Sequence, residues 1–389
     1  MAAATRAGVQ MVAVTVVRGQ ARRRWIVVAA VALGLAAVPA VVSAVPVHPP
    51  AGDRTGLVAK MRASTGQPYH GYAESVGAAG LPALPQLSDV SDLFDGDTRM
   101  RVWYSSASAW RVDVIDVGAE RDTYQTVTGE VTWDYGRNQL TEVDGTLPLR
   151  LPRGADLTPP ELARRLLSLA GTEVTLSALP AQRIAGIDAP GVRLTPTSTL
   201  TTMGHIDLWA DPKTGLPLRV AVTGRGASRP FLTTRFLDVA LTAPDPGVLA
   251  PPAQRPDMSV VGADGSDILG VLRRINNGPL PDRLAGLPRT GTDLGELGGI
   301  ATYGSGLARF LVMSVSRRTG YDAERRALRG GGAALTFPAG DGVLIGTPLL
   351  SLLAMDSHRA GRNYLLVGLV APSLLKRAGA ELSTYTGEQ

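Results

Sequence analysis

Apolar and polar residues alternate along several short stretches in the first half of the chain. Each stretch runs for five to eight residues, is rich in Val, Thr, Trp and Tyr, and ends at Gly, Ser, Asn or Asp. This spacing predicts antiparallel strands in a meander, with one apolar side that another element must cover. The residues assigned to the apolar side are Met100, Val102, Tyr104, Trp110, Val112, Val114, Val131, Trp133 and Tyr135.

A helix predicted over Glu161–Ala170 follows these strands and supplies a cover. Thr158 is placed to cap its N-terminus, Pro159 suits the first turn, and Glu161 completes a capping box. Gly171 ends it. The apolar stripe of this helix consists of Leu162, Leu166 and Leu169.

Further strands between residues 173 and 241 include a hairpin with its turn at Asp211–Gly215. Residues 81–97, broken by two prolines and a glycine, predict a mobile loop. Residues 243–257 contain five prolines and predict a linker between domain 54–242 and a smaller α+β domain, 258–389.

In that second domain, the pattern predicts a helix at residues 266–276 and six strands between residues 301 and 370. One of these strands is expected to run to Arg317. A final helix begins at Pro372.

The charge of the chain lies mostly at its N-terminus. The net charge is +5, from 39 basic and 34 acidic residues, and five of the basic residues lie in residues 1–24. The remaining 34 basic residues therefore balance the 34 acids. Without a global basic field, nucleic acid is not an expected partner.

Residues 1–24 are interpreted as a cytoplasmic basic flank, and residues 25–45 as a signal peptide or transmembrane anchor. The apolar run of 21 residues that begins at Trp25 is long enough to span a bilayer. Val42–Ala44 provides the small residues of a cleavage site. Both interpretations place the remainder of the chain outside the cytoplasm, in the periplasm or cell envelope.

The residue types that support catalysis or metal binding are sparse. The chain has no cysteine, which excludes disulfides and thiolate chemistry. Its four histidines are widely separated, and no pattern of a metalloprotease, phosphate-binding loop or hydrolase elbow occurs. We therefore expect no cofactor, no metal and no enzymatic activity, while a cell-envelope hydrolase assembled from distant residues stays open as an alternative.

Several segments together resemble the LolA/RseB superfamily of periplasmic proteins, whose carrier branch moves lipoproteins and whose RseB (MucB) branch regulates envelope-stress signalling. They are YHGYAES, AWRVDVID, GEVTWDYGRNQLTEV, RIAGIDAPGVRLTPTS and HIDLWADPKTGLPLRVAVTG. Beyond the linker, YGSGLARFLVMSVS and GRNYLLVGLVAPSLLKRAGAEL resemble the C-terminal domain that RseB-type proteins add.

The resemblance implies an unclosed antiparallel β half-barrel with a helical lid and a concave apolar face that holds acyl chains. On this reading the apolar residues above, with Leu162 and Leu166, bind the ligand; otherwise they fill an ordinary core. The implied function is a non-enzymatic regulator that binds a lipid or acylated lipoprotein and a membrane-anchored partner such as an anti-sigma factor. A LolA-like lipid or lipoprotein carrier is the alternative.

Overall fold

The computed structural model contains both helices and strands, with most of the strands in two sheets. Pro49–Gln389 forms one compact unit. The structure describes residues 53–80, 88–116, 118–145, 150, 152–264, 278–290, 299–359 and 361–386. The predicted basic flank, the signal or anchor segment and the helix at 266–276 lie outside these residues. No helix within the described ranges has both the length and the apolar character needed to cross a membrane.

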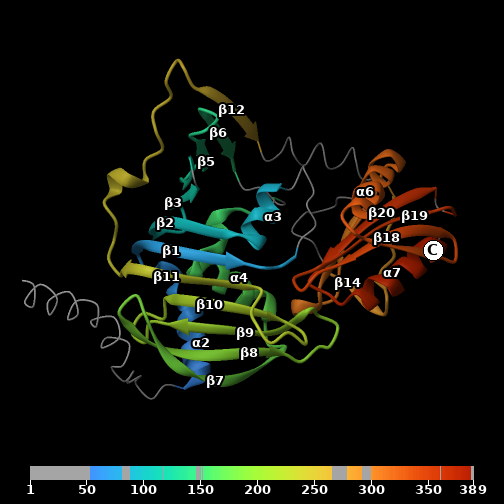
Figure 1. Cartoon of the computed structure of the whole chain (residues 1–389), viewed down its shortest axis with the longest axis horizontal. Helices are drawn as coiled ribbons and strands as arrows, with labels where there is room; N and C mark the ends of the chain where they lie inside the picture. Colours follow the sequence, from blue (N-terminus) through green and yellow to red (C-terminus); the bar gives the residue numbers. More distant parts are fainter. Residues whose placement is uncertain are drawn as a thin grey trace, which may run out of the picture. The chain divides into compact units, whose positions relative to one another are not determined.

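Twelve strands form the first sheet, in the order β12-β6-β5-β4-β3-β2-β1-β11-β10-β9-β8-β7 (Figure 1). Neighbouring strands are antiparallel, except that β12 runs parallel to β6. The edge strands β12 and β7 do not pair with each other, so the sheet is not closed into a barrel. The strands are β1 (Tyr69–Gly77), β2 (Asp97–Ser106), β3 (Ala109–Asp116), β4 (Ala119–Gln125), β5 (Gly129–Asp134), β6 (Gln139–Asp144), β7 (Val174–Ile184), β8 (Ile187–Pro196), β9 (Met203–Ala210), β10 (Pro217–Gly224), β11 (Leu232–Ala240) and β12 (Ser259–Asp264).

The alternation read from the sequence is confirmed in β2. Met100, Val102 and Tyr104 are buried, whereas Arg99 and Arg101 are exposed. The predicted hairpin is also present, because β9 pairs with β10 around Asp211–Gly215. The Asp211 carboxylate accepts hydrogen bonds from the backbone amides of Lys213 and Thr214, which fixes this turn.

Two helices contribute to the core on one face of this sheet, α2 (Arg54–Ala63) and α4 (Pro159–Ala170). Asp53 caps α2 by accepting hydrogen bonds from two backbone amides of the first turn. The deepest residues of α4 are Ala163, Leu166, Leu167 and Ala170. Leu162 and Leu169 of the predicted stripe lie at its edge and are partly buried.

The predicted capping of α4 is wrong in its details. The Thr158 hydroxyl donates to the Ala155 carbonyl, 3.0 Å away, and therefore does not cap the helix. Glu161 instead pairs with Arg164 and Arg165. A short 3₁₀ helix at Gly154–Leu157 directly precedes the helix, and it brings Ala155 within reach of the hydroxyl.

Two further predictions are corrected. Helix α3 (Ser88–Asp95) lies within the stretch predicted as a mobile loop. Residues 173–188, predicted as two strands, form one long β7 up to Ile184, with a register shift between Leu179 and Gln182. In both places, packing against neighbouring strands outweighs the local turn signals.

The second sheet has eight strands, in the order β13-β14-β15-β16-β20-β19-β18-β17. Helix α7 (Pro372–Thr384) shares a core with Leu353 and Leu366. Helix α6 (Arg317–Arg329) packs on Val343 and Ile345, whose side chains alternate with that of Leu344 and so point to the other face. The strands are β13 (Arg283–Leu284), β14 (Leu287–Thr290), β15 (Ile300–Tyr303), β16 (Phe310–Val315), β17 (Ala333–Phe337), β18 (Gly340–Gly346), β19 (Ser351–Ser357) and β20 (Arg362–Gly368).

Helix α6 is absent from the sequence prediction, which continued a strand to Arg317. The strand ends at Val315, and the Ser316 hydroxyl caps the helix by accepting a hydrogen bond from the Thr319 amide. Gly320 permits close packing, because a Cβ there would lie 2.2 Å from the Asn363 side chain.

The proline-rich segment leads into β12, which returns to the first sheet and pairs with β6. Asn138 donates a hydrogen bond to the Asp257 carbonyl at 2.6 Å, next to this pairing. Any division of the chain near residue 257 therefore has to assign β12 to the first sheet. The domain boundaries given above otherwise stay predictions.

Candidate ligand-binding pocket

Eight of the eleven residues predicted to bind a ligand belong to one core, on the face of the first sheet that α2 and α4 cover. They are Met100, Val102, Tyr104, Trp110, Val112, Val114, Leu162 and Leu166. Met100 lies deepest and is fully buried. Four of the eight, Val102, Tyr104, Trp110 and Val112, line a cavity of about 510 Å³.

The other three predicted residues lie on the opposite face, which corrects the prediction of one shared apolar face. Residues directly paired on neighbouring strands point to the same side of a sheet. Trp133 pairs with Asp122, and Asp122 pairs with Asp113, so Trp133 shares the polar face of these acids. Val131 and Trp133 belong to a small separate cluster, and Tyr135 is 63% exposed. Alternation within single strands was read correctly, but the register between strands was not visible in the sequence.

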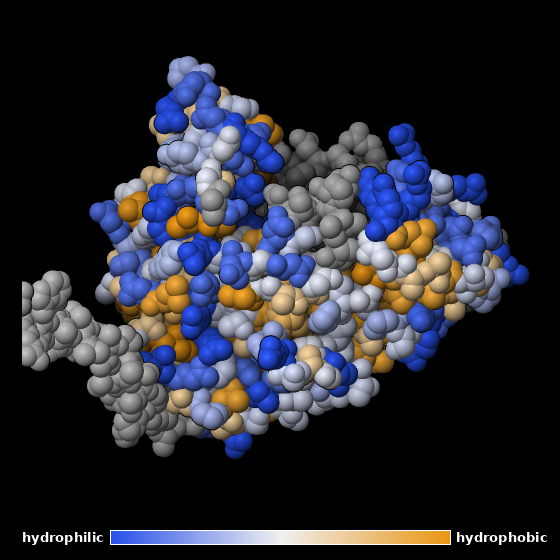
Figure 2. Space-filling model, in the orientation of Figure 1, coloured by the Kyte–Doolittle hydropathy of each residue, from blue (hydrophilic) through white to orange (hydrophobic). Residues whose placement is uncertain are grey.

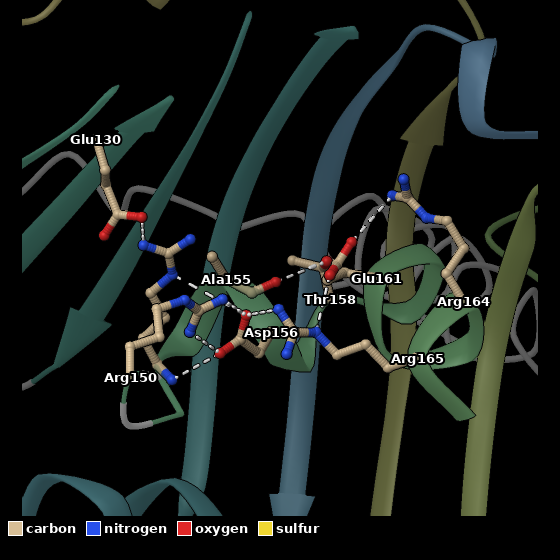
Figure 3. Close-up of polar contacts among 9 residues, drawn as sticks. Glu130, Arg150, Ala155, Asp156, Thr158, Glu161, Arg164 and Arg165 are labelled. Atoms are coloured by element: carbon tan, nitrogen blue, oxygen red, sulfur yellow. Dashed lines mark hydrogen bonds and ion pairs between the residues drawn. The ribbon is translucent and has the colours of Figure 1, made fainter. Parts of the chain in front are cut away.

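Four arginines and three acids surround the cavity on the α4 side (Figure 3). Arg150 holds Asp156 with two hydrogen bonds of 2.6 and 2.7 Å, and Arg165 lies 2.9 Å from the same carboxylate. The remaining members are Arg153, Arg164, Glu130 and Glu161. With all groups ionised, this arginine cluster has one positive charge in excess.

Asp156 is the centre of the cluster and is held as a carboxylate. Burial alone would raise its pKa, but the hydrogen bonds from Arg150 and the charges of three arginines outweigh burial. The pKa of Asp156 therefore lies below its usual value. The backbone amide of Arg153, three residues earlier in the chain, also donates a hydrogen bond of 3.0 Å to this carboxylate.

Arg153 is the least satisfied member of the cluster. It forms an ion pair with Glu130 and lies over the Trp110 ring, 5.3 Å from its centroid. Its Nε atom is buried and makes no hydrogen bond within the described part of the chain. Burial lowers the pKa of Arg153. An Asp156 carboxylate oxygen lies 4.0 Å from this Nε atom, which is too far for a hydrogen bond; an anionic group in the cavity would supply a closer acceptor.

Aromatic rings continue the wall beside the arginines. Tyr69 stacks on Tyr104 with ring centroids 5.1 Å apart. The Arg164 guanidinium carbon lies over the Tyr104 ring, 5.3 Å from its centroid. The Tyr104 hydroxyl donates to the Thr65 carbonyl at 2.6 Å, which fixes the ring. Burial raises the pKa of Tyr69, so this residue stays a neutral part of the wall.

A second cavity of about 270 Å³ lies beside α4, and most of its lining residues are apolar. Arg150, Asp156 and Arg165 line both cavities, so the arginine cluster forms their common border. The apolar lining of the second cavity includes Phe94, Leu162, Leu166, Leu169, Val222 and Phe231. The arrangement places a charged border between a cavity of mixed lining and an apolar one.

On the opposite face, Asp113, Glu120 and Asp122 form the one group of potential metal ligands found among the described residues. Arg111 already occupies this group: it donates to both Asp113 oxygens and, at 2.9 Å, to Asp122. Arg101 pairs with Glu120 at 2.5 Å. Two arginines at the acids disfavour a metal ion, so the group is best described as an ion-pair network.

The pKa values of two carboxyl groups in this network are raised, whereas the pKa of Asp156 in the arginine cluster is lowered. Burial and the nearby charge of Asp113 raise the pKa of Asp122 to about 7. Burial also raises the pKa of Asp113. The two carboxylates are directly opposed on β3 and β4, where like charges repel.

Two of the histidines that the structure describes lie beside carboxylates. His205 lies 3.9 Å from Asp207, and that carboxylate is already held by two hydrogen bonds from Arg193. His358 lies 3.2 Å from Asp356 and is exposed.

Sequence reasoning missed the arginine cluster. Arg150 and Arg153 lie in a connection between predicted elements, and Arg164 and Arg165 occupy the expected polar side of a helix. The available signal was the density of arginine near one acid, four within 16 residues around Asp156. In a chain with 36 arginines this density is inconspicuous.

Comparisons with known proteins give similar solved structures. No family model matches the chain, and no curated protein matches its sequence. A crystal structure of MucB is 18% identical over 85% of this chain and 98% of that chain, with a TM-score of 0.43. The MucA/MucB complex of Pseudomonas aeruginosa gives 17% identity over 84% of this chain and 97% of that chain, with a TM-score of 0.46. A LolA superfamily protein from Nitrosomonas europaea is 13% identical over 52% of this chain and 99% of that chain, with a TM-score of 0.24. These solved structures are what the chain is similar to, at identities below 20% and TM-scores below 0.5.

Proposed function

We propose that the protein is an extracytoplasmic, non-enzymatic binding protein of the RseB-like regulatory kind. Its first sheet would act as a half-barrel and α4 as part of a lid over an apolar chain of a lipid or acylated ligand. The observation that carries this proposal is the pair of cavities that meet at the arginine cluster. A cavity with apolar walls and a few convergent polar groups is the usual form of a small-molecule site.

The two cavities suit two parts of one amphiphile. Each CH₂ removed from water contributes about 0.8 kcal/mol, so a chain in the apolar cavity would supply most of the affinity. Leu162 and Leu166 of α4 would contact that chain. A polar end of the ligand would then lie in the larger cavity, where Arg153 Nε makes no hydrogen bond with the described residues.

The proposed location outside the cytoplasm rests on the sequence of residues 1–45. The proposed membrane-anchored partner, such as an anti-sigma factor, rests on the resemblance to RseB proteins; MucB itself has been solved in complex with MucA. Lipid carriage of the LolA kind would need the same cavities without a stable protein partner. A membrane pull-down with the full chain separates the two: a retained membrane protein is expected for the regulator and none for the carrier.

The test of ligand binding is lipid analysis by mass spectrometry of the full chain purified from a bacterial host, alongside two variants. Leu162→Asp places a charge at the apolar cavity, and Leu237→Asp places the same charge at an exposed leucine of β11, which is 40% accessible. We expect bound lipid in the wild type and in Leu237→Asp, and its loss in Leu162→Asp. Circular dichroism confirms that each variant is folded. Absence of lipid from the wild type, or equal retention by both variants, would refute the proposal.

A further inference from the structure

Helix α6 carries an exposed basic surface that the proposed pocket does not use. The helix contains five arginines and two acids. Six of its seven exposed residues follow helical spacing along one side, and the seventh, Thr319, lies apart from them. The six include four of the five arginines together with two apolar side chains. The exposed members of this α6 surface are Arg317, Arg318, Tyr321, Arg325, Leu328 and Arg329. In Figure 2, strongly hydrophilic atoms gather over this helix.

The packing of α6 fixes the direction of this surface. Gly320 and Ala327 are its buried residues, and they lie against Asn363 and against Val343 and Ile345, respectively. The Asn363 amide donates to Glu324 at 3.3 Å, which engages one of the two acids of the helix with the sheet. Because small residues face the sheet, the long arginine side chains are left on the outer side.

The arginines of α6 differ in their partners from three arginines that lie on or beside the first sheet. Arg111, Arg150 and Arg193 each bind a carboxylate at 2.9 Å or less. Within the described part of the chain, Arg318, Arg325, Arg326 and Arg329 form no ion pair; Arg325 instead lies 5.6 Å from the centroid of the Tyr321 ring. These positive charges are therefore available to an external anionic surface.

We propose that the α6 surface binds an anionic lipid bilayer through its phosphate groups. A guanidinium group matches the geometry of phosphate oxygens, and each arginine near an anionic membrane surface contributes about 1 kcal/mol. Tyr321, which is 59% exposed, and Leu328, which is 49% exposed, provide the amphipathic and apolar contacts that suit the interfacial region.

Two observations favour a bilayer over an acidic protein segment. Neither of the two cavities described above has an α6 residue in its lining, whereas a protein partner usually buries an anchor residue in a pocket. The chain also carries a 21-residue apolar run at its N-terminus that suits a membrane, which would bring the folded unit close to lipid headgroups. This inference does not depend on a ligand in the pocket.

The experiment is vesicle flotation with a chain that begins at Pro49. This chain comprises the whole compact unit and omits the apolar run that would itself enter lipid. One vesicle population is pure phosphatidylcholine, and the other contains about one third phosphatidylglycerol. We expect the chain to bind the anionic vesicles alone. This binding should be lost when the salt concentration is raised to about 0.5 M, because salt screens exposed charges.

Two matched double variants identify the surface. Arg318→Gln with Arg325→Gln removes two charges from α6, whereas Arg229→Gln with Arg309→Gln removes two exposed charges elsewhere. The first pair is expected to weaken binding roughly 30-fold, and the second far less. All four positions are exposed, so loss of folding is not expected, and circular dichroism checks it.

Three results would overturn the inference: equal binding to both vesicle types, equal weakening by the two double variants, or binding of acidic polyglutamate by a chain that ignores anionic vesicles. The last result would assign the surface to an acidic protein partner. A chain that binds anionic vesicles through α6 but carries no lipid in its pocket would leave this inference intact and contradict only the proposed function.

Discussion

The two faces of the strands β2–β6 each bring arginines and buried acids together, but in opposite proportion. On the face covered by α4, Asp156 is shared by Arg150 and Arg165, and the arginines outnumber the acids. On the other face, Asp113 and Asp122 share Arg111, and the acids outnumber the arginines. The same residue types therefore produce a cluster with spare donors on one face and a pair of acids that retains a proton on the other.

This difference separates a surface suited to a ligand from a surface that neutralises itself. Arg153 keeps a buried donor that makes no hydrogen bond with the described residues, at the wall of the larger cavity. Asp122 reduces its own charge through its raised pKa. An anionic group would find a free donor only in the first arrangement, which is why the proposed ligand is assigned to the α4 side.

The largest expected effect comes from removing the centre of the arginine cluster. Asp156→Ala leaves Arg150 and Arg165 without their shared carboxylate, and breaking such a buried pair costs about 3 kcal/mol or more. Asp188→Ala is the matched control, because its pair with Arg183 is more exposed and should cost about 0.5 kcal/mol. Urea unfolding measures both. Equal losses in the two variants would show that the cluster is no more than a surface ion pair.

A second prediction concerns pH and the opposite face. A carboxyl group whose pKa is raised in the folded state binds more protons there than in the unfolded chain, so stability falls as pH rises. For Asp122 this fall should extend from near its usual value of 3.8 to about 7. Asp122→Asn should flatten the dependence of the melting temperature over this range. An unchanged slope in the variant would assign the dependence to other groups.

Asp156 should behave in the opposite way. Its pKa is lowered on folding, so its contribution is present above the unfolded value and is lost as pH falls through the folded value. Acid unfolding of wild type and Asp156→Asn should therefore converge at the lowest pH at which the chain still folds. A difference that stays constant down to that pH would show that the carboxylate charge of Asp156 does not stabilise the cluster.

The smallest expected effect concerns the charge of the ligand. Arg164→Gln should weaken binding of a fluorescent fatty acid by about 1 kcal/mol, roughly fivefold, because one positive charge leaves the cavity wall. Arg101→Gln removes a charge from the opposite face and should leave binding unchanged. Titration of fluorescence measures both affinities. A larger loss of affinity in Arg101→Gln than in Arg164→Gln would place the ligand on the face opposite α4 and contradict the proposed site.

The sequence predicted the strands and the cover of the first sheet because both depend on local periodicity. Met100, Val102 and Tyr104 alternate within one strand, and no other part of the chain is needed to read that pattern. The face of Trp133 depends on its pairing with Asp122, a contact between strands that periodicity does not encode. One aromatic strand was therefore assigned to the wrong side.

The functional contacts were harder to predict for the same reason. Arg150 and Asp156 are close in sequence, but their burial depends on α4 packing over the sheet. Helix α6 was missed because Leu311 and Val312 continue an apolar run towards it, and the cap at Ser316 was not recognised. In each case a long-range contact or an unrecognised cap decided the structure.

Photoaffinity labelling tests the central claim most directly. The full chain is incubated with a fatty acid that carries a photoreactive group at the end of its tail, irradiated and analysed by peptide mass spectrometry. The account predicts labels at the apolar cavity, on α4 residues such as Leu162 and Leu169 and on β10 at Val222. Labels concentrated around Trp133 and Tyr135 on the opposite face, or no specific label, would contradict it.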